Sequence, residues 1–145
     1  MELTKFSDYS LRLLIYLGLH RDRLVSISEV ANAYGISRNH LVKIVTHLAQ
    51  LEHVQTVRGK YGGLRLAREP EDINIGVLVR QTETSLTVLE CFDPETNTCR
   101  ISPCCSLKGV LRRALAAFFQ ELDKHTLADV LGNQSQLKAI LSALK

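Results

Sequence analysis

Residues 26–51 distribute apolar and polar side chains as two short amphipathic helices joined by a tight turn. Ser26 and Glu29 form a Ser-x-x-Glu capping box, which predicts where the first helix begins. Gly35 predicts where it ends, because glycine adopts the left-handed conformation at little cost. Ser37 then predicts the start of a second helix. The inner face of that helix carries Leu41, Ile44, Val45 and Leu48.

The outward positions of the second helix are polar or cationic. They are Arg38, Asn39, His40, Lys43, Thr46 and His47. This is the layout of a helix-turn-helix whose second helix enters the major groove of DNA. An ordinary helical hairpin with a solvated polar face has the same pattern, so the stretch alone leaves both interpretations open.

A β-hairpin is predicted directly after this motif. Residues 54–57 and 64–66 alternate as short strands, and the glycine-rich stretch RGKYGG between them predicts a turn. A hairpin in this place is typical of a wing, although its tip charges would also serve as solvating groups on a turn. Its cations suit a phosphate or a narrow minor groove. The predicted DNA contacts are therefore Ser37, Arg38, Asn39, His40, Lys43, Arg58 and Lys60.

Periodicity predicts further helices on both sides of this region. A first helix opens at Phe6-Ser7-Asp8 and ends near His20, and a short one covers residues 73–84. The longest runs over residues 106–124, followed by a short helix through Leu131 and a weaker one over residues 136–144. Residues 85–105 keep no periodicity, which predicts a loop held in place by what it binds.

The helix over residues 106–124 carries an apolar stripe too broad for a small wing domain to cover. The stripe consists of Leu107, Val110, Leu111, Ala114, Leu115, Phe118, Phe119 and Leu122. Burial inside the chain and burial against a second copy both remain open. We expect a homodimer, because palindromic operators match a two-fold protein that offers one recognition helix per chain.

These patterns together predict a mainly α fold, a winged helix-turn-helix with a two-stranded wing and a long C-terminal dimerisation helix. The expected DNA-binding domain covers residues 1–84, with the helix-turn-helix at about 26–51 and the wing at about 54–67. A cysteine-rich loop at 85–105 and the dimerisation and C-terminal helices at 106–145 complete the chain.

Charge supports a nucleic-acid partner for the first half of the chain. Residues 1–68 hold ten Lys or Arg against five Asp or Glu, whereas residues 69–145 hold eight against ten. The basic half coincides with the predicted helix-turn-helix and wing, as an electrostatic footprint on DNA requires.

Other function classes receive little support. An apolar fraction of 46% suits a globular core, and no apolar run approaches the roughly 20 residues that cross a bilayer. The N-terminus has acids and no apolar signal region, so we expect a cytoplasmic protein without a membrane partner. Five scattered histidines and no Ser/His/Asp or paired-carboxylate arrangement predict that the chain is not an enzyme.

All four cysteines lie between residues 91 and 105, with the spacing Cys91-x7-Cys99-x4-Cys104-Cys105. Clustering in a reducing compartment points to a metal or redox centre rather than a disulfide framework. The spacing lacks the paired Cys-x2-Cys of a zinc ribbon. An iron–sulfur cluster, zinc, a thiol redox switch and structural free cysteines all remain open, with the cluster favoured.

The order of these elements resembles the Rrf2 family of bacterial regulators over nearly the whole chain. The strings LTKFSDYSLR, GISRNHLVKI, VRGKYGGLRL and CRISPCCSLK are similar to the nitric oxide-sensing repressors of that family. The resemblance implies a cluster, [4Fe–4S] in preference to [2Fe–2S], that Cys91, Cys99 and Cys105 hold. Cys104 stands where the family usually has a small residue.

The resemblance also implies a fourth ligand, which maps to Asp8 of the partner subunit. The alternative for Asp8 is an acid in the first turn of a helix, paired with Arg12 four residues on. In another iron–sulfur branch of the family a histidine is the ligand, but its position here is Lys108. A charged lysine cannot ligate, which argues against that branch.

The function expected from this resemblance is repression. A dimer with its cluster intact would bind an inverted-repeat operator and leave it when nitric oxide nitrosylates the cluster. The alternatives are a related regulator that senses iron–sulfur status or redox state, and a zinc or thiol redox repressor on the same scaffold.

Overall fold

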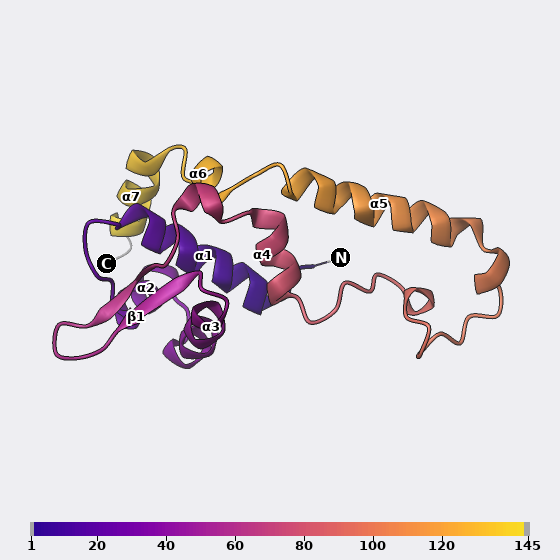
Figure 1. The fold of residues 1–145 in the computed structure, drawn as a ribbon, viewed down its shortest axis with the longest axis horizontal. Helices are drawn as coiled ribbons and strands as arrows, with labels where there is room; N and C mark the ends of the chain where they lie inside the picture. The colour runs from indigo at the N-terminus through magenta and orange to yellow at the C-terminus, as the bar shows by residue number, and fades with distance from the viewer. Residues whose placement is uncertain (1, 144–145) are drawn as a thin grey trace.

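The computed structural model describes residues 2–143, and helix α1 (Lys5–Leu19) runs through the middle of the body (Figure 1). Thr4 begins this helix, because its hydroxyl oxygen accepts a hydrogen bond from the Ser7 amide at 3.2 Å. Leu13, Leu14 and Leu17 are buried along its length. The helix thereby supplies the surface on which the DNA-binding elements pack.

The predicted helix-turn-helix is confirmed as helices α2 (Ile27–Tyr34) and α3 (Arg38–Gln50). The Ser26–Glu29 capping box is present in both directions, and Gly35 ends α2 with a φ of 63°. The four predicted inner residues of α3, Leu41, Ile44, Val45 and Leu48, are all buried. Periodicity and caps therefore specified this motif locally.

The wing is also confirmed. Strand β1 (Val54–Val57) pairs antiparallel with β2 (Gly63–Leu66), with Val54 opposite Leu66 and Val57 opposite Gly63. Gly59 takes a φ of 109° in the turn, which an L side chain rarely adopts. Val25, just before α2, adds two backbone hydrogen bonds to Leu64 at 2.8 and 3.0 Å, so the wing is anchored to the body.

The remaining helices divide between the body and an arm. A 3₁₀ turn (Pro70–Asp72), α4 (Ile75–Thr82), α6 (Leu127–Val130) and α7 (Gln134–Ala143) lie on the body. Met1, Leu144 and Lys145, which belong to predicted segments, lie outside the described residues. With these helices and the confirmed motif, the fold is the mainly α winged helix-turn-helix that the sequence predicts.

Helix α5 (Ser106–Leu122) extends from the body as an arm, and the segment between α4 and α5 leads from the body out to its far end (Figure 1). Its base is fixed where Phe119 packs on Ile75 and Val79 of α4, and where both guanidinium nitrogens Nη1 and Nη2 of Arg80 donate to Asp123 at 2.6 and 2.8 Å. Two short 3₁₀ turns, Glu90–Phe92 and Ser102–Cys104, interrupt the loop.

Within residues 2–143 no helix combines the length and the apolar character that crossing a bilayer requires.

Candidate functional site

The predicted base and phosphate contacts on α3 are exposed. Ser37, Arg38, Asn39, His40 and Lys43 face away from the four buried residues of the helix. Ser37 is the N-cap, but its side chain makes no capping hydrogen bond, so its hydroxyl is not used by its own helix. Helix α3 lies at the edge of the body, near the wing (Figure 1).

The wing tip presents a second set of exposed groups. Arg58 and Lys60 flank Gly59, and Tyr61 is 84% exposed with its ring centroid 5.6 Å from the Lys60 ammonium nitrogen. Arg65 on β2 is exposed and donates from Nε to the Gln55 side-chain oxygen at 2.8 Å. Sequence reasoning missed Tyr61 and Arg65, although their outward positions on the hairpin were a usable signal.

Ion pairing separates these cations from the other arginines of the N-terminal half. Four ion pairs hold arginines of the body: Arg12–Asp8, Arg21–Glu69, Arg23–Glu29 and Arg68–Glu52. Across residues 2–143, no ion pair involves the four predicted cationic contacts Arg38, Lys43, Arg58 and Lys60. Their charge is therefore available to an anion outside the chain.

One outward residue of the predicted recognition helix is placed differently. His47 faces α4, where its Nε2 donates to the main-chain oxygen of Gln81 at 3.0 Å. Its ring also meets Phe6 edge-on, with centroids 5.3 Å apart. The prediction that His47 points outward was wrong, because α4 and the start of α1 cover that end of α3.

The four cysteines are free thiols in unlike environments. Cys91 is buried, Cys99 and Cys105 are half-buried, and Cys104 is exposed with its Sγ 3.5 Å from the Ile101 carbonyl oxygen. Cys104, which the resemblance sets apart from the ligands, is thus also the most accessible of the four.

Hydrogen bonds fold the loop so that its cysteine segments approach one another. The Thr98 hydroxyl donates to Glu90 at 3.2 Å, which joins the residues that directly precede Cys99 and Cys91. The Lys108 ammonium group donates to the Ser102 hydroxyl at 3.0 Å, which joins the first turn of α5 to the 3₁₀ turn that precedes it. Lys108 is therefore occupied by a structural contact.

Cys105 occupies the N-cap of α5, and its side chain makes no capping hydrogen bond. The first amides of a helix lack intrahelical acceptors and carry partial positive charge, which stabilises an anion there. A thiolate ligand at this position would benefit from that field.

Asp8 lies in the first turn of α1, and within residues 2–143 it forms no metal-binding group with the cysteines. Its two oxygens bind Arg12 at 2.9 and 2.8 Å, and this hydrogen bond raises the pKa of the Arg12 guanidinium. Burial raises the pKa of neighbouring Tyr34 to about 12, so its hydroxyl stays protonated. The alternative expected for Asp8, a pair with Arg12, is what the chain forms by itself.

The donor set fits an iron–sulfur cluster chemically, since free thiols on an irregular loop are the ligands such clusters take. Across residues 2–143, however, no three His, Cys, Asp or Glu side chains converge closely enough to hold a metal ion. The single chain therefore contains the thiol ligands, but they do not converge on one point.

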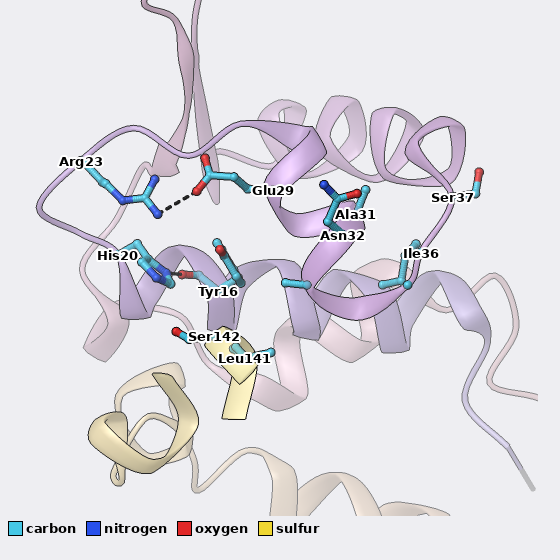
Figure 2. A pocket seen from close by; sticks show the side chains of 12 residues that line it. Tyr16, His20, Arg23, Glu29, Ala31, Asn32, Ile36, Ser37, Leu141 and Ser142 are labelled. Carbon is cyan, nitrogen blue, oxygen red and sulfur yellow. Dashed lines mark hydrogen bonds and ion pairs between the residues drawn. The ribbon is translucent and has the colours of Figure 1, made fainter. Parts of the chain in front are cut away.

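A hollow of about 980 Å³ opens behind α2, between the end of α1 and α7 (Figure 2). Its polar groups are largely paired with each other, since Arg23 donates to Glu29 at 2.8 Å and the His20 ring contacts the Tyr16 carbonyl oxygen at 2.9 Å. Of the predicted site residues it contains only Ser37. It therefore lies apart from the cysteine loop.

Comparisons with known proteins agree on one family. Residues 3–133 match the Rrf2 family, described as iron-dependent transcriptional regulators. Two relatives named HTH-type transcriptional regulator NsrR, from Halalkalibacterium halodurans and Bacillus subtilis, are 51% and 49% identical, and each alignment covers 97% of both chains.

Solved structures give the same answer for the fold. IscR of T. potens matches with a TM-score of 0.73 and 28% identity, over 92% of this chain and 88% of that one. CymR, the global cysteine regulator of B. subtilis, matches with a TM-score of 0.72 and 25% identity, over 91% and 97%.

Proposed function

Because the chain belongs to the Rrf2 family of transcriptional regulators, we propose that it is a cytoplasmic iron–sulfur repressor that binds operator DNA as a homodimer and responds to nitric oxide. The relatives named NsrR support a repressor role, and they support a regulator in place of an enzyme. The finer parts of the proposal rest on the chain's own residues.

The observation that carries the proposal is the unpaired positive charge on α3 and the wing. Arg38, Lys43, Arg58 and Lys60 are exposed, while the body arginines beside them are neutralised by carboxylates. All four lie on the predicted recognition helix or at the tip of the wing, so their charge is gathered where a DNA duplex would dock. Phosphates attract such a set, and the exposed polar groups of α3 would then meet base edges.

Helix α5 supports a homodimer. Leu107 and Val110 are 57% and 50% exposed on its apolar stripe, in the half of the helix away from its packing against α4. A second copy of the same helix would cover this stripe by a two-fold contact. Two chains then present two recognition helices to an inverted repeat.

In this proposal Cys91, Cys99 and Cys105 hold the cluster, and Asp8 of the second chain completes the site. A bound cluster would supply an iron with a weak carboxylate ligand, at which nitric oxide reacts. The role of the chain is to exchange Asp8 between that site and Arg12. The exposed Asp8–Arg12 pair contributes only about 0.3–0.5 kcal/mol, so Asp8 can leave Arg12 to bind the cluster of the other chain.

The test is an absorption spectrum of protein purified without oxygen, with iron and sulfide assays, before and after stoichiometric nitric oxide. Binding to a DNA duplex, recovered with this protein from a random-sequence pool, is followed in parallel by anisotropy. Visible absorption that bleaches as DNA is released supports the proposal. A colourless protein with zinc or no metal, whose DNA binding ignores nitric oxide, contradicts it.

A further inference from the structure

Two histidines from the DNA-binding elements form hydrogen bonds to Gln81, in the last turn of α4. His47 of α3 donates from Nε2 to the main-chain oxygen of Gln81 at 3.0 Å. His53, which begins the segment leading into β1, donates from Nε2 to the Gln81 side-chain oxygen at 2.8 Å. Both imidazoles must be the donors, because amide oxygens only accept.

His53 is held where α3 meets the wing. It is only 3% exposed, its amide donates to the Leu48 carbonyl at 2.9 Å, and its carbonyl accepts from Ala67 at 3.0 Å. Within the described chain its ring Nδ1 has no hydrogen-bond partner, so the bond to Gln81 is the one that orients the ring. Gln81 thus holds the ring of a buried residue between the two DNA-contacting elements.

The last residue of α4 and the residue that caps it hold the beginning of α1. The Thr82 and Ser7 hydroxyls share a buried hydrogen bond of 2.8 Å. Oε1 of Glu83 accepts from the Thr4 amide at 2.8 Å and from its hydroxyl at 3.1 Å. Asp8 directly follows Ser7, so this contact fixes the segment that carries Asp8.

Residue 84, directly after this turn, begins the loop that carries the cysteines. Three consecutive residues therefore touch the recognition helix, the wing junction and the start of α1 at the point where the loop leaves the body. We propose that residues 81–83 couple the cysteine loop to the DNA-reading surface, with Gln81 as the positioning residue for α3. This inference rests on the proposed function, since it explains how a change in the loop would reach the DNA.

The physical basis is the stiffness of a helical turn. Backbone hydrogen bonds hold Gln81, Thr82 and Glu83 in fixed relation, so a pull on the loop moves all three together. Their contacts of 2.8–3.0 Å weaken steeply with small displacements. A loop that changes shape would therefore reposition His47 and His53, and with them the exposed face of α3.

Gln81→Leu removes the side-chain acceptor and leaves the main-chain one. Because Gln81 is exposed, the substitution spares the core. Gln81→Glu keeps an acceptor oxygen, and Gln50→Leu changes an exposed glutamine at the end of α3 that hydrogen-bonds to neither histidine, as a matched control. Affinity for the selected DNA duplex is measured for cluster-loaded and metal-free forms of each protein, and the ratio of the two affinities is the readout.

We expect Gln81→Leu to reduce this ratio about three- to tenfold, the effect of one lost hydrogen bond, while Gln81→Glu and Gln50→Leu keep it. Hydrogen exchange in the second half of α3 provides a readout independent of DNA. Cluster loading should slow exchange there in the wild type and no longer do so in Gln81→Leu, although the loop itself remains protected.

An unchanged ratio in Gln81→Leu, or affinities that fall equally in both forms, would show a structural role only and overturn the coupling. Should Gln81→Leu not fold, Glu83→Ala breaks the same turn at its contact with Thr4, and the same reduction of the ratio is expected. A wild type without iron and sulfide, or with a ratio of one, overturns the proposed function and the coupling with it, which separates the two failures.

Discussion

In the proposed function the carboxylate of Asp8 serves two states of the chain, paired with Arg12 in one and bound to the cluster in the other. In the single chain it is bound by Arg12, and both side chains are about two-fifths exposed. Solvent screening keeps such a pair weak, so the pair does not commit Asp8 to a structural role. The thiols are likewise uncommitted, because none forms a disulfide.

Single-residue changes in the loop should divide the four cysteines. We expect Cys91→Ala, Cys99→Ala and Cys105→Ala each to remove the iron and sulfide and the specific DNA binding, because three thiolates are needed to hold the cluster. Cys104→Ala, at the exposed thiol, should retain both. The measurement is iron, sulfide and visible absorption of each variant. A Cys104→Ala protein that loses its colour while Cys105→Ala keeps it would reverse the assignment.

On the recognition helix, Arg38→Ala should weaken binding to the selected duplex by about 1–3 kcal/mol, because it removes an unpaired cation from the start of α3. Cluster content should not change. Anisotropy at fixed salt measures the effect, and Arg113→Ala, an exposed arginine on α5, is the control. Equal affinities for Arg38→Ala and wild type would remove Arg38 from the contacts.

At the scale of elements, the wing and α2 show two kinds of local specification. The turn depends on the positive φ of Gly59, and α2 begins with reciprocal bonds between Ser26 and Glu29 at 3.1 and 3.0 Å. Neither feature requires distant residues. Both were therefore visible in the sequence.

The wing cations should act through phosphates. Replacing Arg58 and Lys60 together with alanine should reduce the slope of log affinity against log salt by about 0.9 per lost phosphate contact. The fold should be retained, because both side chains are exposed. Titrations at several salt concentrations measure the slope, and an unaltered slope would mean that the wing stays off the backbone.

Ser26→Ala should lower the free energy of unfolding by about 1 kcal/mol, because the amide of Glu29 loses its capping acceptor. Urea denaturation followed by circular dichroism measures this. Ser135→Ala in α7, an exposed serine, provides the comparison. Equal loss in both variants would mean that the cap contributes nothing.

At the scale of the whole molecule, the arm is the feature whose apolar stripe a single chain leaves exposed. Val110→Asp should dissociate the proposed dimer, because it places a charge on the exposed apolar stripe of α5. The monomeric variant should still unfold at a temperature set by the body of the chain, which the substitution does not touch. Sedimentation equilibrium measures the mass, with Gln120→Asp, at an exposed position of α5 outside the apolar stripe, as the control. A Val110→Asp protein that remains a dimer would place the interface elsewhere.

Local pattern by itself determined the helix-turn-helix, the wing, the long helix and the exposed cations of α3. Caps, periodicity and turn glycines act over a few residues, so each could be read without knowing what packs on it. The grouping of four cysteines in one loop was equally a property of the sequence.

Only the tertiary structure decided which way His47 faces and that His53 and His47 meet at Gln81. It also decided that, within residues 2–143, Asp8 forms no metal-binding group with the cysteines. Gln81 is separated from these histidines by 34 and 28 residues, a distance over which no periodic pattern carries information. Such contacts arise from how α4 packs against α1 and α3, and packing depends on the shape of whole faces, which the order of residues does not display.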